Sequence, residues 1–199
     1  MVTRLILASN SRIRATLLSN AGLDFEVEPA RVDEESIRLG LDSEGAPPRD
    51  IADTLAEAKA RKVSGRHPGA MVLGCDQILA HDRRILSKPQ SPEEAEAQLK
   101  SLAGSSHKLL SAAVLYEDQE PIWRHVGEVR MTMRPLSDAY IRDYVARNWD
   151  SIRWSVGAYK LEEEGVRLFT EVKGDYFTVL GLPLLDFLSF LTLRGTLPS

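Results

Sequence analysis

A short apolar run near the start of the chain ends at small polar residues, and an arginine follows within one helical turn. The run is Leu5-Ile-Leu-Ala8, the polar residues are Ser9, Asn10 and Ser11, and the arginine is Arg14. Helical spacing of apolar residues begins directly afterwards, so the segment predicts a strand that leads into a helix. Free N–H groups at a helix N-terminus, hydroxyl donors and a guanidinium group together bind phosphate. An ordinary N-cap by one of the serines explains the same residues equally well.

Carboxylates and lysines occur at the ends of other predicted elements. Glu34 follows a strand, Lys59 lies beside the apolar face of a helix, and Asp76 follows a continuous apolar strand. Lys88 and Glu162 come later in the chain. A triphosphate carries about four negative charges, so lysine or arginine serves the oxygens that a metal does not shield, while Mg²⁺ or Mn²⁺ prefers carboxylate and phosphate oxygens. These residue types predict a metal-dependent phosphate site.

The pattern of apolar residues and capping residues predicts alternating strands and helices. Strands are expected at residues 5–8, 25–27, 70–74, 108–116, 123–133, 156–161 and 166–172, with a hairpin over 78–86 that turns at 82–84. Helices are expected from 13 to 22, from 48 to 62, from 91 to 104 and from 137 onward, with an apolar helix near residue 184 and beyond. Residues 31–35 and the polar stretch 40–49 are expected to form loops.

Composition limits the class of protein. The 199 residues, 43% of them hydrophobic, can bury one substantial core, so we expect a single domain over residues 1–199. A net charge of −4 argues against polymeric nucleic acid as a partner but permits a local basic pocket. No apolar run is long enough for a signal peptide or a membrane span, so we expect a soluble, cytoplasmic protein. The sequence leaves open whether it is a monomer or a homodimer. Trp123, Trp149 and Trp154 could serve the core or a dimer contact, and we expect them in the core.

Several other kinds of site are excluded. The chain has no Gly-rich loop ending in Gly-Lys-Ser/Thr, which excludes the usual ATPase loop. Its four histidines are scattered and lack zinc spacing, and the single cysteine, Cys75, cannot form an intramolecular disulfide. Cys75 closes an apolar strand, so we expect a small core residue rather than a nucleophile.

Seven short motifs together resemble the Maf family of nucleoside triphosphate pyrophosphatases. They are Leu7-Ala-Ser-Asn-Ser11 with Arg14, Val32-Asp-Glu34, Leu55-Ala-Glu-Ala-Lys-Ala-Arg61, Leu73-Gly-Cys-Asp-Gln77, Ser87-Lys-Pro89, Gly157-Ala-Tyr159 and Gly181-Leu-Pro-Leu184. They occur in the family's order and span nearly the whole chain. The resemblance implies an α/β fold like that of inosine triphosphatase, with a mixed twisted sheet, flanking helices and a cleft between two lobes. It also implies hydrolysis of a nucleoside triphosphate to the monophosphate and pyrophosphate with Mg²⁺, Mn²⁺ or Co²⁺, in a house-cleaning role against modified nucleotides.

The resemblance also implies a role for each matching residue. Asp76 matches the catalytic carboxylate that orients or deprotonates water and helps to hold metal, and Glu34 matches a second metal carboxylate. Lys59 and Lys88 match two catalytic lysines that neutralise phosphate charge. Arg14 matches an arginine that, with Ser9, Asn10 and Ser11, binds phosphate. If the motifs are set aside, each residue has an ordinary structural explanation. Asp76 would be a strand-end cap, Glu34 would belong to a solvated acidic loop, and Lys59 and Lys88 would be surface lysines.

The chain departs from the common family pattern at two places. Arg12 stands where proline is usual and Ile13 where an arginine is usual, so one phosphate-binding cation is missing. Gln77 and Glu162 look more like the branch that acts on 7-methyl-GTP than the branch that acts on dTTP and UTP. An exposed place within Glu162–Glu164 explains Glu162 almost equally well. The altered Arg12-Ile13 pair leaves a second hypothesis open, a nucleotide-binding regulator of cell division or septum formation with incidental hydrolysis.

Overall fold

The computed structural model describes residues 4–198, and the chain divides there into two compact units. The first contains the residues up to Gln77, Ser111–Gly127 and the residues from Tyr176 onward, and the second contains Ile78–Leu110 and Glu128–Asp175. The unit boundaries within the sheet fall inside three strands, β3 (Met71–His81), β5 (Ser106–Glu117) and β6 (Glu120–Met133). The prediction of a single domain over residues 1–199 stays a prediction.

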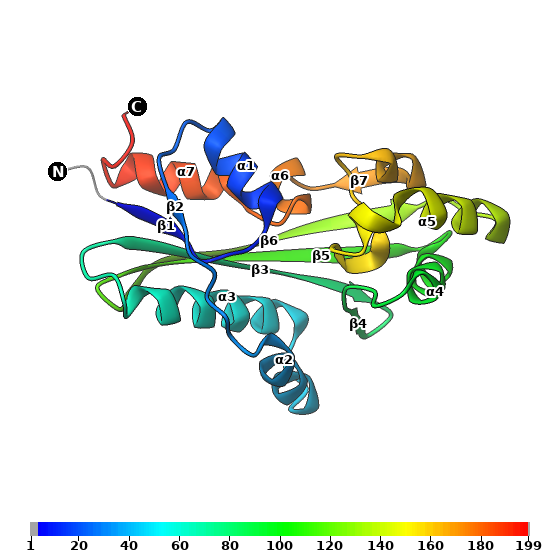
Figure 1. The fold of residues 1–199 in the computed structure, drawn as a ribbon, viewed down its shortest axis with the longest axis horizontal. Coiled ribbons are helices and arrows are strands. Elements are labelled where there is room, and N and C mark those ends of the chain that lie inside the picture. Colours follow the sequence, from blue (N-terminus) through cyan, green and yellow to red (C-terminus); the bar gives the residue numbers. More distant parts are fainter. Residues whose placement is uncertain (1–3, 199) are drawn as a thin grey trace. The chain divides into compact units, whose positions relative to one another are not determined.

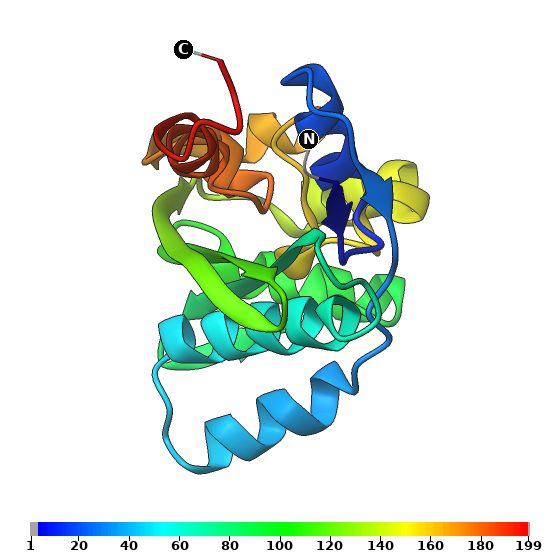
Figure 2. The ribbon, with the colours of Figure 1, turned by 90° about the vertical axis from the view of Figure 1, so that its left-hand side faces the viewer.

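The first unit has helices on both faces of its strands. The strand β1 (Leu5–Leu7) pairs in parallel with β2 (Glu26–Val27) and with β3. One face is covered by α3 (Pro48–Ser64), and the other is covered by α1 (Arg12–Asn20) and α7 (Leu184–Leu193) (Figure 1). The helix α2 (Glu34–Ser43) lies outside α3 (Figure 2), and α6 (Tyr176–Val179) precedes α7. The core of this unit includes Leu7, Leu73 and Phe187.

The second unit contains shorter strands and its own helices. The strand β4 (Arg84–Leu86) pairs antiparallel with β3, and β7 (Phe169–Lys173) pairs antiparallel with β6. The helix α4 (Pro92–Leu102) packs against α5 (Asp138–Ile152) and against the 3₁₀ turn η1 (Val156–Ala158), and a second turn, η2 (Glu164–Leu168), precedes β7. The strand order β2-β1-β3-β5-β6-β7, with β4 beside β3, makes the sheet mixed, which confirms the predicted α/β class.

Two parts of the secondary-structure prediction are wrong. Residues 31–35 and 40–49 were expected to be loops, but α2 (Glu34–Ser43) overlaps both of them. Asp33 caps this helix, and its carboxylate accepts a hydrogen bond from Ser36 N at 3.1 Å. None of the residues of α2, all of which the structure describes, is buried, although Ile37 and Leu41 recur at helical spacing and are partly buried. No strand forms at 156–161, where residues 156–158 are a 3₁₀ turn and Gly157 and Ala158 have φ values of +75° and +56°. The strand predicted at 166–172 is confirmed from Phe169 onward, because the η2 turn continues to Leu168 and β7 begins directly after it.

The other predicted elements are confirmed within a few residues. Ser91 and Ser137 cap α4 and α5 by accepting hydrogen bonds from Glu94 N and Tyr140 N, each at 3.2 Å. Trp123 packs against the core beside Phe187. Trp154 does not, because 65% of it is exposed and the guanidinium of Arg153 lies over its ring.

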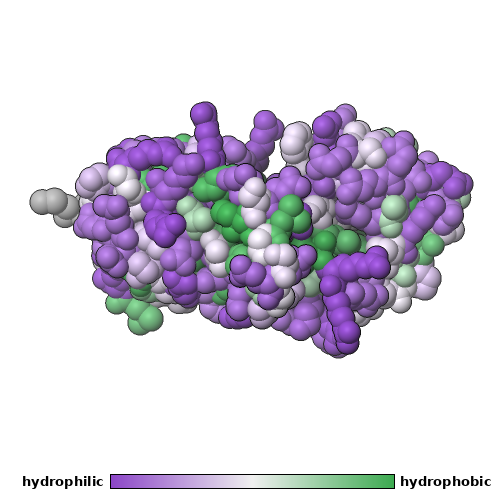
Figure 3. All heavy atoms as spheres, turned by 90° about the horizontal axis from the view of Figure 1, so that it is seen from below, coloured by the Kyte–Doolittle hydropathy of each residue, from purple (hydrophilic) through white to green (hydrophobic). Residues whose placement is uncertain are grey.

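Hydrophilic side chains cover most of the face shown in Figure 3, with smaller hydrophobic areas between them. Within residues 4–198, no helix combines the length and the apolar character that crossing a bilayer requires. Large hydrophobic side chains that remain exposed include Leu39 on α2 and Leu193 at the end of α7.

Candidate active site

Lys59 lies at the centre of the candidate site because its ammonium group contacts two carboxylates. Its Nζ lies 2.6 Å from Oδ1 of Asp76 and 3.0 Å from Oε2 of Glu34. The side chains of Lys59 and Asp76 are only 9% and 10% exposed, whereas that of Glu34 is 53% exposed. The structure therefore brings three predicted site residues together, and it shields one of the two ion pairs from water.

A glycine in β3 allows α3 to lie close enough for this contact. A Cβ atom at Gly74 would lie 2.1 Å from the carbonyl oxygen of Ala56 and 2.6 Å from the amide nitrogen of Ala60. Backbone atoms cannot move aside as a flexible side chain can, so a larger residue here would push α3 away from β3. Lys59 lies directly before Ala60 and Asp76 lies two residues after Gly74, so the close approach holds the ion pair in reach.

Burial determines the protonation behaviour of Asp76. Burial raises the pKa of the Asp76 carboxyl above its ordinary value, and the nearby charge of Glu34 adds a smaller increase. Lys59 and Arg14 act in the opposite direction, yet the net shift of the pKa is upward. A buried carboxylate with a raised pKa accepts a proton more readily than an exposed one, which suits a general base.

The guanidinium group of Arg14 joins the segments around Asp76. Its Nε donates to Gly181 O at 2.7 Å, and its Nη1 donates to Cys75 O at 3.1 Å and to Ser9 Oγ at 3.2 Å. Arg14 is buried. These bonds fix the carbonyl group directly before Asp76, so Arg14 positions the carboxylate. The predicted contact of Arg14 with phosphate stays a prediction and would use the remaining nitrogen, Nη2.

Gln77 fixes the chain on the other side of Asp76, a role that the sequence analysis missed. Its Nε2 donates to Ser111 Oγ and Val179 O, both at 2.9 Å, and to Thr178 O at 3.3 Å. The residues before and after Asp76 are thus both tied to the segment 178–181. The nearby motif Gly181-Leu-Pro-Leu184 is the sequence signal that could have pointed to this contact.

Ser9 and Ser11, which precede α1, do not form the ordinary helix cap. Ser11 occupies the N-cap position of α1, but its side chain makes no capping hydrogen bond, and its amide nitrogen donates to Ser9 Oγ at 3.2 Å. Ser9 is buried and Asn10 is exposed. The alternative explanation of Ser11 as a side-chain cap is therefore wrong, and phosphate binding by residues 9–11 stays a prediction.

One residue beside the site was expected in the core, and two predicted site residues belong to the second unit. Cys75 is fully buried, which confirms the predicted core position, and burial raises the pKa of its thiol to about 11. That it is not a nucleophile stays a prediction. Lys88 and Glu162 belong to the second unit, where both are exposed. Their contributions to catalysis and to substrate binding stay predictions.

The acidic groups available for a metal are few. Among residues 4–198, no group of three or more histidine, cysteine, aspartate or glutamate side chains is placed to hold a metal ion. Mg²⁺ needs only one or two carboxylates when substrate phosphates and water complete its coordination. Glu34 and Asp76, which reach the same ammonium nitrogen, meet that smaller requirement.

A family model described as Maf-like protein matches residues 4–193. The chain belongs to this family. A nucleoside triphosphate pyrophosphatase of Ruegeria pomeroyi is 64% identical over 100% of both chains. A 7-methyl-GTP pyrophosphatase of Mesorhizobium japonicum is 47% identical over 99% of both chains. A solved nucleoside-triphosphatase / dITP/XTP pyrophosphatase from Mycobacterium abscessus is 16% identical, covers 98% of both chains and has a TM-score of 0.43. The sequence-based assignment to the Maf family is confirmed.

Proposed function

We propose that this Maf protein hydrolyses nucleoside triphosphates to nucleoside monophosphate and pyrophosphate. The observation that supports this most strongly is the buried Lys59–Asp76 pair with Glu34 on the same ammonium group. It places a proton acceptor beside a cation, which are the two groups that water attack on a phosphoanhydride needs. The names of relatives that match nearly the whole chain point to the same reaction.

The chemical step would be in-line attack of water on the α-phosphorus. The Asp76 carboxylate accepts the proton of the water, the new bond joins the water oxygen to the α-phosphorus, and the bond from that phosphorus to the bridging oxygen breaks. Pyrophosphate leaves with the bonding electrons, and its charge is balanced by Lys59 and Lys88. Residues 9–11 and Arg14 would orient the phosphates by their N–H, hydroxyl and guanidinium donors.

A divalent cation fits the donor set of Glu34 and Asp76, and when bound it would polarise the phosphate oxygens. The role of Arg14 and Gln77 is to hold Asp76 in place, as their hydrogen bonds to the segment 178–181 indicate. We also propose that the protein acts in the cytoplasm on small nucleotides, either as a monomer or as a homodimer.

A substrate panel with an Asp76→Asn variant tests the function. Pyrophosphate release would be measured from GTP, 7-methyl-GTP, dTTP and UTP with Mg²⁺, Mn²⁺, Co²⁺ or a chelator. We expect metal-dependent turnover, about 10²- to 10⁴-fold lower in the variant, with nucleotide binding retained. Asp24→Asn is the matched control, because it makes the same change at an exposed site in the same unit. Near-normal turnover in Asp76→Asn would remove Asp76 from catalysis, and binding without turnover on every substrate would favour the regulator hypothesis.

A further inference from the structure

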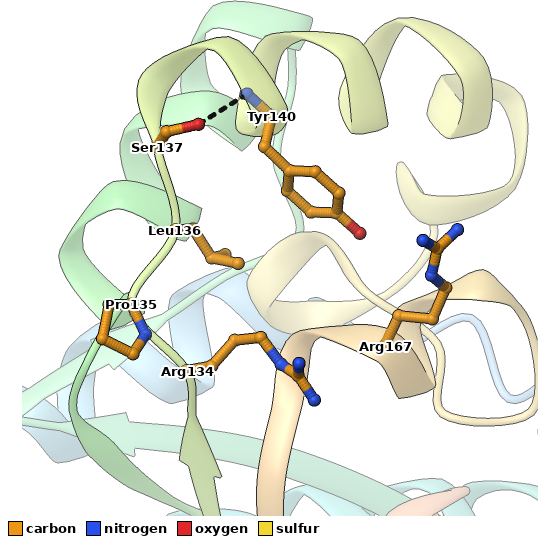
Figure 4. A pocket seen from close by; sticks show the side chains of 6 residues that line it. All are labelled: Arg134, Pro135, Leu136, Ser137, Tyr140 and Arg167. Atoms are coloured by element: carbon orange, nitrogen blue, oxygen red, sulfur yellow. Dashed lines mark hydrogen bonds between the residues drawn. The ribbon is translucent and has the colours of Figure 1, made fainter.

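The second unit contains a pocket of about 410 Å³ that belongs to none of the predicted site residues. It is lined by Arg134, Pro135, Leu136, Ser137, Tyr140 and Arg167. The lining thus includes two guanidinium groups and a phenol but no carboxylate. Tyr140 extends from α5 toward the side of the pocket where the two arginines lie (Figure 4). A pocket lined by two cations and no acid is suited to an anion.

Hydrogen bonding fixes one of these cations before any ligand arrives. Nη2 of Arg134 donates to Phe169 O at 2.8 Å, which holds the guanidinium group against the start of β7. Within the described chain, Nε and Nη1 of Arg134 form no hydrogen bond and remain able to donate. A guanidinium group that is already oriented loses less conformational entropy when it binds, so it contributes more to affinity.

The other cation, Arg167, is only weakly neutralised by its neighbour. Its Nη1 lies 3.7 Å from Oε1 of Glu164, which is longer than a hydrogen bond. The same oxygen accepts a hydrogen bond from Arg147 at 2.8 Å, and the other oxygen of Glu164 accepts one from Asn148 at 2.9 Å. Glu164 is therefore already paired, and most of the charge of Arg167 is available to a ligand.

The first turn of α5 forms another side of the pocket, which Ser137 and Tyr140 line. Ser137 Oγ accepts the hydrogen bond of Tyr140 N, while the amide groups of Asp138 and Ala139 have no partner within the helix. The acid in this turn, Asp138, is paired with Lys100 at 3.3 Å. We propose that this pocket, through Arg134, Arg167 and Tyr140, binds the phosphoryl group of a small molecule.

The shared chemistry of the ligand is a phosphate group, which inorganic phosphate, pyrophosphate or a nucleoside monophosphate could supply. Two-dimensional amide NMR of the intact chain, titrated with each of the three, distinguishes these sources. Signals of residues 138–140 report on the pocket, and signals of residues 9–11 report separately on the candidate active site. We expect saturable shifts at 138–140, with the tightest-binding probe identifying the source.

The variant Arg134→Gln/Arg167→Gln should weaken that binding at least about tenfold, because hydrogen bonds from charged donors are lost. Arg142→Gln is the control, since it removes an exposed arginine of α5, the helix that carries Tyr140, outside the pocket. Thermal unfolding verifies that each variant is folded. The proposal is overturned if no probe shifts the amides of 138–140 at millimolar concentration, or if Arg142→Gln weakens binding as much as the double variant. Neither result depends on whether the chain hydrolyses triphosphates.

Discussion

Lys59→Met removes the ammonium group that contacts Asp76 and Glu34 but keeps a long side chain in the same space. Because the side chains of Lys59 and Asp76 are each about nine-tenths buried, the change leaves a carboxylate with its main partner missing. Breaking a buried ion pair in this way costs about 3–5 kcal/mol of unfolding free energy. Arg14 still attracts the carboxylate, so we expect a loss near the lower end of that range at pH 7. The half-exposed contact with Glu34 adds little.

A double-mutant cycle with Asp76→Asn isolates this pair. The unfolding free energy of the four proteins would be measured by urea denaturation without nucleotide or metal. We expect Lys59→Met to cost at least about 2 kcal/mol less in the Asp76→Asn background, where no buried charge is left behind. If Lys59→Met costs the same in both backgrounds, the pair is not coupled in the folded state and the reasoning is refuted.

The same comparison has a predicted pH dependence. Without Lys59, the pKa of Asp76 in the folded state rises further above its value in the unfolded chain, because a group that lowers it is lost. A folded state with the higher pKa binds the proton more tightly, so the stability of Lys59→Met increases relative to wild type as the pH falls from 8 to 5. A constant difference over that range would contradict this explanation.

Three further changes test other parts of the structure. Cys75→Ala should keep turnover within about twofold of wild type and lose about 1 kcal/mol of stability, because only a buried sulfur is removed. Gly74→Ala should cost about 3 kcal/mol or more in urea denaturation, since its Cβ would meet Ala56 O, whereas Gly40→Ala, with open space around it, should not destabilise. Burial lowers the pKa of His107 to about 4, so wild-type stability should fall as the pH drops from about 6.5 to 4, by up to about 3 kcal/mol, and His107→Gln should remove this component.

Local patterns in the sequence were sufficient to predict most strands and helices. The capping residues Ser91 and Ser137 and the apolar run at 70–74 are signals within a few neighbouring residues, and the structure confirms them. The failures have local causes too. The apolar face of α2 is short, with Ile37 and Leu41 only partly buried, and the positive φ of Ala158 cannot be read from its residue type.

The candidate site was only partly predictable, because its contacts join distant segments. The motifs indicated that Glu34, Lys59 and Asp76 belong together, but they did not reveal that one ammonium group contacts both acids. Arg14 was expected to bind phosphate, while its hydrogen bonds to Cys75 O and to a segment 167 residues away show a positioning role. Such partners depend on how the chain packs in three dimensions.

The exposed character of α2 has a consequence for hydrogen exchange. Local opening of a helix is less costly when the helix buries little apolar surface, and α2, which packs against α3, has no buried residue of its own. Its amides should therefore exchange with solvent well before those of α3, where Ile51, Ala52 and Lys59 are buried. Glu34 thus belongs to an element that opens early, whereas Lys59 and Asp76 belong to elements that open only with the core. Any ligand held by Glu34 together with Asp76 would slow exchange in α2 first, because binding would link the least protected helix to the most protected strand.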